Sequence, residues 1–258
     1  MRILILGGTT EASELARLSA GDQRFSPTLA LAGRIAAPAQ FPIPCRVGGF
    51  GGAERLADWL DAEHIRAVVD ATHPFAARIS ANARAAAQRR ELPLLVLRRD
   101  PWKLTDGDRW VRVPDIDAAV AELGLGAQRV FLTIGRQHVG AFRAAPQHDY
   151  LVRCIEPPAP NALPPRCRLL LHRGPFDIEA EGELLQAQAI DVVVAKNSGG
   201  AATYAKIAAA RRLGLPVIMI ERPVEPAGAT VRSARAAMDW LSYLLGHDHK
   251  GVASERGV

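Results

Sequence analysis

The sequence predicts an α/β protein built from two halves, each with a doubly wound, mainly parallel sheet. Three observations lead to this fold class. Short, continuous apolar runs such as residues 3–6 are typical of strands that are covered on both faces. These runs alternate with segments of helical character, as parallel sheets require. The alternation restarts after a polar loop at residues 100–108, which indicates a second half.

The first half opens with a strand, a glycine turn and a helix in RILILGGTTEASELARLSA. Thr9 or Thr10 can cap this helix, and Glu11 and Glu14 suit the positive charge of its N-terminal end. The later elements follow the same alternation. We expect further strands in PTLALAGR, CRVGGFGG, IRAVVDATHPFA and LPLLVLRR, and helices over residues 53–62 and 75–90.

The second half repeats the pattern from residue 109 onward. We expect strands in RWVRV, RVFLTIGR, HDYLVRCIEPP, CRLLLHRGPF, DVVVAKNSGG and LPVIMIERP, and helices over residues 115–123, 176–187, 203–213 and 234–245. The chain is therefore predicted to form an N-terminal domain, residues 1–104, and a C-terminal domain, residues 105–258.

Composition favours a cytoplasmic globular protein. The 258 residues are 48% hydrophobic, and no apolar run approaches the roughly 18 residues that span a bilayer. The N-terminus lacks the long apolar region of a signal peptide. The three cysteines are far apart and show no metal-ligand spacing, so we expect neither a disulfide nor a metal site. For His247 and His249 a solvated tail is favoured over metal binding.

The charge pattern points to an acidic small molecule. The formal net charge is +5, and only four of the 32 basic residues are lysine. Arginine richness can reflect a high-GC genome, or it can serve binding of carboxylate or phosphate groups. Without a long basic run, and with only 5% aromatic residues, we do not expect nucleic acid or a membrane as a partner.

Ligands of open α/β sheets bind beyond the carboxyl ends of the strands. In the first half, the N–H groups of Gly7, Gly8, Thr9 and Thr10 can approach a pyrophosphate at a helix start. GGTTEA does not match GxGxxG, so an ordinary strand–helix turn is an alternative. Arg34 ends the second strand, where arginine suits the 2′-phosphate of NADP, although it can also be a surface residue. Together these features favour NADPH over NADH.

The residues that follow the third and fourth strands are predicted to lie at the same carboxyl edge of the sheet, which we call the rim. Gly49 and Phe50 follow the third strand, and Thr72 and His73 follow the fourth. His73 can line a ligand pocket or donate a proton, because its reference pKa lies near neutrality. A structural histidine in a turn is the alternative.

In the second half, DVVVAKNSGG carries the densest group of polar residues. Lys196, Asn197 and Ser198 leave a buried strand, and Gly199 and Gly200 permit close backbone approach, so we expect an anion site. A solvated lysine and a Schiff-base lysine are alternatives for Lys196. From their strand-end positions, two further residues are candidate carboxylate partners, Arg136 and Arg222. The absence of a GxSxG motif disfavours a hydrolase.

Four motifs in this order resemble the precorrin-6A reductase family of cobalamin (vitamin B12) biosynthesis. They are GGTTEA, GGFGG, DATHPFA, and AKNSGG followed by PVIMIERP, and the resemblance covers nearly the whole chain. It implies two Rossmann-like domains with a cleft between them and strands exchanged across the domains. It also implies NADPH-dependent reduction of a double bond in the precorrin-6A macrocycle, giving precorrin-6B. A cobalt-precorrin-6A reductase, an NADP-binding protein without tetrapyrrole reductase activity and a transferase are the alternatives.

The resemblance also implies roles for single residues. Gly7 to Thr10, Arg34, Gly49, Phe50, Thr72 and His73 would bind NADPH. Residues 196–200 would bind the macrocycle or the nicotinamide end, with Lys196, Ser198 and His73 as catalytic candidates. The cofactor supplies the hydride chemistry, so no strong protein nucleophile is expected. Channelling of the tetrapyrrole to neighbouring enzymes of the pathway is a further expectation.

Overall fold

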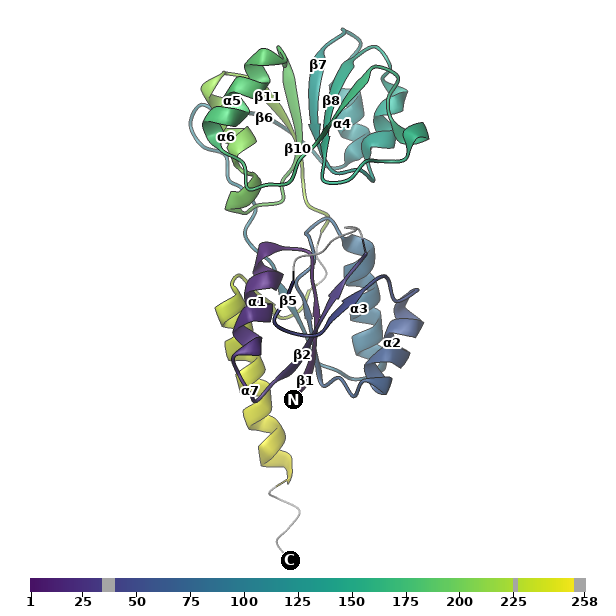
Figure 1. Ribbon diagram of the computed structural model, residues 1–258, viewed down its shortest axis with the longest axis vertical. Helices are drawn as coiled ribbons and strands as arrows, with labels where there is room; N and C mark the ends of the chain where they lie inside the picture. The colour runs from purple at the N-terminus through teal and green to yellow at the C-terminus, as the bar shows by residue number, and fades with distance from the viewer. Residues whose placement is uncertain (34–39, 225–226, 253–258) are drawn as a thin grey trace, which may run out of the picture. The chain divides into compact units, whose positions relative to one another are not determined.

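The computed structural model describes residues 1–33, 40–224 and 227–252. The chain divides into two compact units (Figure 1). Unit 1 comprises Met1–Arg99 and Glu225–Val258, and unit 2 comprises Asp100–Val224. Each unit contains its own six-stranded sheet with helices on its faces, which confirms the predicted α/β class.

The sheet of unit 1 has the strand order β12-β5-β4-β1-β2-β3, and the strand pairs are parallel. Its strands are β1 (Arg2–Leu6), β2 (Ser26–Leu31), β3 (Cys45–Val47), β4 (Ala67–Asp70), β5 (Leu94–Leu97) and β12 (Thr230–Val231). Helices α1 (Thr10–Ala20) and α7 (Ala234–Val252) cover one face, and α2 (Ala53–Ala62) and α3 (Ala77–Arg89) cover the other (Figure 1).

Strand β1 shows why the sequence of a central strand is apolar without interruption. Ile3 and Ile5 pack with Leu15 of α1 on one face of the sheet. Leu4 and Leu6 pack against α2 and α3 on the opposite face. Successive side chains of a strand point to opposite faces, so a strand covered on both sides loses the polar alternation of a surface strand.

The sheet of unit 2 has the strand order β6-β11-β10-β7-β8-β9 and is likewise parallel. Its strands are β6 (Arg109–Val113), β7 (Arg129–Thr133), β8 (Asp149–Cys154), β9 (Cys167–Leu171), β10 (Val192–Lys196) and β11 (Pro216–Ile220). Its helices are α4 (Ile116–Glu122), α5 (Ile178–Ala187) and α6 (Ala205–Arg212), with short 3₁₀ turns η1 (Val139–Ala144), η2 (Pro160–Ala162) and η3 (Ala201–Thr203).

Both sheets have the strand order 3-2-1-4-5-6 of the Rossmann fold, and their sixth strands are exchanged. Position six beside β5 is filled by β12, which comes from the end of the chain. Position six beside β11 is filled by β6, which directly follows β5 in sequence. This topology confirms the strand exchange that the family resemblance implied.

The exchange corrects the predicted domain boundaries. The prediction placed residues 105–258 in one C-terminal domain, but the segment from residue 225 belongs to unit 1. Strand β12 pairs with β5, and α7 packs on α1 within the same apolar core. The apolar face of α7 is visible in the sequence, but its partner is not.

In each sheet the strand order reverses between two neighbouring strands, and this switch point is where α/β folds place ligands. The switch point lies between β1 and β4 in unit 1 and between β7 and β10 in unit 2. Among the residues the structure describes, no helix is long and apolar enough to cross a membrane.

Candidate functional site

In unit 1 the turn after β1 brings backbone to the surface at the switch point. The N–H group of Gly7 donates to the carbonyl oxygen of Ala30 at 2.8 Å, which extends the β1–β2 ladder by one residue. A Cβ atom on Gly7 would lie 2.7 Å from Leu29 Cδ1, so a larger residue there would have to displace the Leu29 side chain. Gly8 has φ of +127°, and no described heavy atom lies within 4 Å of the place where its Cβ would stand. The turn therefore offers bare backbone to a ligand.

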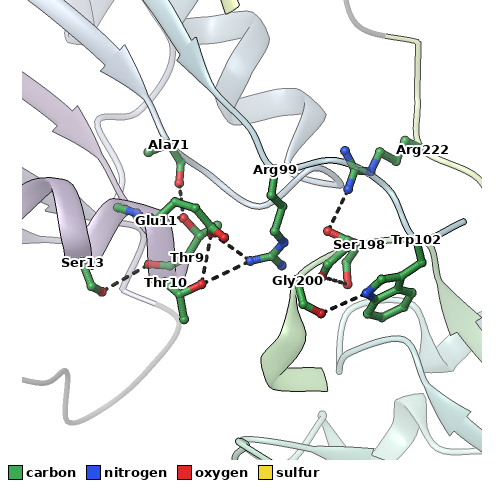
Figure 2. Close-up of polar contacts among 12 residues, drawn as sticks. Thr9, Thr10, Glu11, Ser13, Ala71, Arg99, Trp102, Ser198, Gly200 and Arg222 are labelled. Carbon is green, nitrogen blue, oxygen red and sulfur yellow. Dashed lines mark hydrogen bonds and ion pairs between the residues drawn. The ribbon is translucent and has the colours of Figure 1, made fainter. Parts of the chain in front are cut away.

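Thr9 joins this turn to the end of β4 across the switch point. Its hydroxyl accepts a hydrogen bond from the Ala12 N–H group at 3.1 Å and donates one to the Ala71 carbonyl oxygen at 2.9 Å (Figure 2). Thr9 is thus the N-cap of α1, as predicted. The first N–H groups of a helix have no acceptor inside the helix, so this end attracts anions such as a pyrophosphate.

Arg99 lies beside the same helix end and was missed by the sequence analysis. It follows β5, and its Nη1 atom lies 2.9 Å from Glu11 Oε2 and 3.5 Å from Thr10 Oγ1 (Figure 2). The side chains of Arg99 and Glu11 are each only 17% exposed. A guanidinium in this position places positive charge next to the predicted pyrophosphate turn. Its position after LPLLVL was the sequence signal that pointed to it.

The predicted cofactor residues after β3 are organised by Arg46. Its Nη1 atom donates to the Gly48 carbonyl oxygen at 2.7 Å, and its Nη2 atom donates to that of Gly49 at 3.3 Å. The guanidinium carbon lies 4.2 Å from the centre of the Phe50 ring. Arg46 therefore fixes both Gly49 and Phe50. Arg34, the predicted partner of a 2′-phosphate, lies outside the described residues.

Thr72 and His73 both make short-range contacts after β4. Asp70 Oδ1 accepts hydrogen bonds from the Thr72 N–H group at 3.1 Å and from its hydroxyl at 2.7 Å, and Thr72 is buried. The Phe75 N–H group donates to His73 Nδ1 at 3.2 Å. The Nδ1 atom is therefore an acceptor, and the neutral His73 ring carries its proton on Nε2.

In unit 2 the loop after β10 is held by contacts far along the chain. Asn197, 2% exposed, accepts a hydrogen bond from the Trp102 N–H group on its Oδ1 atom at 2.8 Å. Its Nδ2 atom donates to Glu221 Oε2 at 3.3 Å. The predicted role of Asn197 was ligand contact, but the structure shows its amide binding two other segments of unit 2.

The glycines of this loop are required by a close approach of the chain at Asp100. Gly199 has φ of +65°, and a Cβ atom there would lie 2.0 Å from the Asp100 carbonyl oxygen. The indole Nε1 of Trp102 donates to the Gly200 carbonyl oxygen at 2.9 Å (Figure 2). Arg222 donates to the carbonyl oxygens of Asn197 and Ser198 at 2.8 and 2.9 Å. Arg222, which was predicted to pair with a substrate carboxylate, holds the backbone of this loop through these two hydrogen bonds.

Two charged residues at the carboxyl end of the unit 2 sheet have side-chain partners. Lys196 Nζ lies 2.9 Å from His138 Nδ1, a residue that the sequence analysis did not select. Arg136 forms an ion pair with Glu156 at 2.8 Å. The structure therefore places Lys196 and Arg136 at the predicted rim of unit 2, while Arg222 holds the β10 loop.

Next to the loop, unit 2 has an open pocket of about 620 Å³ lined partly by Trp102, Phe176, Tyr204 and Gly200. Lys206 is buried close to it, with its ammonium group 5.1 Å from the centre of the Trp102 ring. Burial lowers the pKa of Lys206 to about 7. No group of three or more His, Cys, Asp or Glu residues in the described part of the chain can hold a metal ion.

Comparison with known proteins identifies the family. The family described as precorrin-6x reductase CbiJ/CobK matches residues 2–242. The chain belongs to the precorrin-6x reductase family. It is 49% identical to the precorrin-6A reductase of Rhodobacter capsulatus over 257 residues, which is 100% of this chain and 99% of that protein. The cobalt-precorrin-6A reductase of Priestia megaterium is 27% identical over 86% of this chain and 90% of its own length.

A solved structure gives the same result for the fold. The structure named CobK precorrin-6A reductase matches with a TM-score of 0.88 and 50% identity, covering 94% of this chain and 96% of that chain. Membership in a reductase family implies a nicotinamide cofactor. The bare backbone at Gly8 and the capped N-terminus of α1 fit the pyrophosphate of such a cofactor.

Proposed function

We propose that this precorrin-6x reductase family member reduces one double bond of precorrin-6A to give precorrin-6B in cobalamin biosynthesis, with NADPH as its hydride donor. The observation that supports the substrate is 49% identity to a precorrin-6A reductase along the whole chain. The lower identity to the cobalt-precorrin-6A reductase of Priestia megaterium favours the cobalt-free macrocycle.

The cofactor is proposed to bind unit 1 at the switch point between β1 and β4. Gly7 and Gly8 admit the pyrophosphate to the start of α1, whose N–H groups hold its charge. Thr9 and Thr10 position this turn, and Arg99 adds a positive charge beside it. When bound, the dihydronicotinamide supplies the hydride, and the protein holds it in a fixed orientation.

The adenosine end is proposed to lie along the carboxyl ends of β2 and β3. Arg34 and Arg46 are the candidates for the 2′-phosphate, because arginine at this edge distinguishes NADPH from NADH. Phe50, with the Arg46 guanidinium 4.2 Å from its ring centre, gives a flat surface beside Gly49. Thr72 and His73 complete the proposed cofactor site after β4.

The macrocycle is proposed to bind at the carboxyl end of the unit 2 sheet. Its acetate and propionate side chains match the positive charges of Lys196 and Arg136, and the N–H groups of Gly199 and Gly200 can add hydrogen bonds. Asn197 and Arg222 serve this site through the shape of the loop. Ser198 remains a proposed contact of the substrate.

Stopped-flow spectroscopy with enzymatically made precorrin-6A tests this function directly. We expect loss of NADPH absorbance with formation of precorrin-6B, and slower reaction with cobalt-precorrin-6A. Binding of NADPH without turnover of a verified substrate would instead identify an NADP-binding protein that is not a reductase. No binding of NADPH in calorimetry would favour a transferase.

The cofactor preference needs its own variant. Arg34→Ala should weaken binding of NADPH strongly and binding of NADH little, because only NADPH carries the 2′-phosphate. Arg24→Ala is a suitable control, because Arg24 pairs with Asp22 in the loop before β2, at the opposite end of that strand. Equal losses for both cofactors in Arg34→Ala would remove Arg34 from the 2′-phosphate site.

A further inference from the structure

His138 and Lys196 meet at the switch point of the unit 2 sheet. Lys196 is the last residue of β10, and His138 follows the neighbouring strand β7 at the start of η1. Lys196 Nζ and His138 Nδ1 are 2.9 Å apart. The two strands pair in parallel up to Thr133 and Ala195, so their ends open at the same point of the sheet. A titratable pair therefore occupies the position at which this fold binds ligands.

With Lys196 as an ammonium, the contact determines which nitrogen of the imidazole ring carries the proton. A lysine ammonium has three donors and no acceptor, so the His138 Nδ1 atom accepts from it. The neutral ring then carries its proton on Nε2. A second positive charge on the ring at this distance is disfavoured by repulsion, so the pair carries a single positive charge.

We infer that His138 and Lys196 form a proton relay for the reduction, an inference that rests on the proposed function. Reduction of a carbon–carbon double bond adds one hydride and one proton, and the hydride comes from the bound dihydronicotinamide. The electron pair of the double bond takes the Nε2 proton of His138, while Nδ1 takes a proton from the Lys196 ammonium. His138 stays neutral in this step, and Lys196 becomes a neutral amine. Water then protonates Nε2 while Nδ1 returns its proton to the Lys196 amine, which restores the starting state.

A comparison with His73 explains why His138 suits this role. Both rings accept a hydrogen bond on Nδ1, but the donor to His73 is the backbone N–H group of Phe75, at 3.2 Å. A backbone amide does not release its proton, so His73 would become an imidazolate after donating from Nε2. The donor to His138 is an ammonium, which can replace the proton that the ring gives away.

The packing around the pair holds both partners in position. Lys196 remains in register with Ile220 of β11, and the preceding residue Ala195 is fully buried. Directly after His138, Val139 and Phe142 are fully buried in unit 2. General acids act efficiently when the donor is held within hydrogen-bond reach of its target. The anchors on both sides hold the two side chains against each other, as a proton transfer between them requires.

The tautomer can be measured without substrate or cofactor. Two-bond ¹⁵N–¹H correlation spectra of the imidazole rings should show His138 with its proton on Nε2 and an unprotonated Nδ1. His138→Gln identifies the signal, and the spectrum of Lys196→Met should show a changed Nδ1 shift because the donor is lost. A ring protonated on Nδ1 in the wild-type protein would overturn the relay.

Single-turnover reduction with NADPH and precorrin-6A measures the step itself. We expect His138→Gln to react about 10²–10⁴-fold more slowly, with NADPH binding and thermal unfolding close to wild type. Lys196→Arg should also lose about 10²-fold, because arginine keeps the charge but does not release a proton. The wild-type reaction should be slower in D₂O, and added imidazole should restore part of the rate of His138→Gly. His247→Gln, on exposed α7 surface, is the matched control.

The outcomes separate the relay from the proposed function. A wild-type protein that does not reduce precorrin-6A would end the proposed function. A wild-type protein that is active, together with His138→Gln and Lys196→Arg variants at the wild-type rate, would end the relay alone. A slow His138→Gly variant without imidazole rescue and without a D₂O effect in the wild type would assign His138 a structural role.

Discussion

Replacement of Gly199 by alanine should destabilise unit 2 by about 3–4 kcal/mol. The left-handed backbone at φ +65° costs a non-glycine residue about 1–2 kcal/mol. The new Cβ atom would also lie 2.0 Å from the Asp100 carbonyl oxygen, so this part of the backbone has to move. The movement strains the hydrogen bonds that Trp102 makes to Asn197 and Gly200, each contributing about 1 kcal/mol.

Urea unfolding followed by tryptophan fluorescence provides the assay. The four tryptophans are divided between the units, so Trp59→Phe and Trp240→Phe in the parent protein leave only the indoles of unit 2, Trp102 and Trp110. The midpoint of Gly199→Ala should fall with an unchanged slope, because the slope reports the surface exposed on unfolding.

Gly182→Ala is the matched control for this substitution. Gly182 lies inside α5, and no described heavy atom lies within 4 Å of the added Cβ atom. Alanine should therefore stabilise this helix by about 0.5–1 kcal/mol. If Gly199→Ala and Gly182→Ala shift the midpoint in the same direction, the close approach of Gly199 to Asp100 is refuted.

Three further predictions test other parts of the structure. Burial lowers the pKa of Lys206 from 10.5 to about 7, so the unfolded chain binds more protons between these values. The free energy of unfolding of the protein should therefore rise with pH in this range, by at most about 1.4 kcal/mol per pH unit. The urea midpoint of the wild-type protein should be higher at pH 9 than at pH 7, and this difference should be absent in Lys206→Met. An equal difference in both proteins would assign it to other groups. Asn197→Leu should cost about 2–4 kcal/mol in thermal unfolding, since the Trp102 N–H group and the Glu221 carboxylate lose a buried partner, and an unchanged melting temperature would contradict this packing. Arg99→Met should weaken NADPH and NADH by a similar factor of about 10 in calorimetry, as expected for a charge beside the pyrophosphate; a loss confined to NADPH would place Arg99 at the 2′-phosphate.

The central strands and the glycine turn could be predicted because their causes are local. A strand covered on both faces must be apolar throughout, and β1, β4 and β10 show that pattern directly. Thr9 or Thr10 was predicted as a cap because a hydroxyl before a helix start satisfies a free N–H group, and the structure selects Thr9. Each of these features can be predicted from a few residues that are neighbours in the sequence.

The exchange of the sixth strands could not be derived from local pattern. Strand β12 contains only two residues, and its partner β5 lies more than a hundred residues earlier in the chain. Strand β6 has three exposed residues among its five, as an edge strand can, and nothing in that pattern indicates which sheet it joins. Only the family resemblance implied the exchange, and the assignment of residues 225–258 to the second domain was wrong for this reason.

The polar residues of the site show a similar division. The strand-end rule correctly placed Lys196 at the rim of a sheet, but it does not distinguish residues that face a ligand from those that hold a loop. Asn197 binds Trp102, 95 positions earlier in the chain, and no local pattern indicates that partner. A segment rich in hydrogen-bond donors after a strand is therefore good evidence for a structured strand end and weaker evidence for direct contact with a ligand.

The pairings of Arg99 and His138 depend on strand order. Arg99 meets Glu11 across 88 positions, and His138 meets Lys196 across 58 positions. Residues after β7 and β10 become neighbours only because the sheet reverses its order there, and the same reversal opens the site for a ligand. A histidine three residues beyond the Gly135 turn has no distinguishing local pattern. Its chemistry becomes visible once the topology places an ammonium beside its ring.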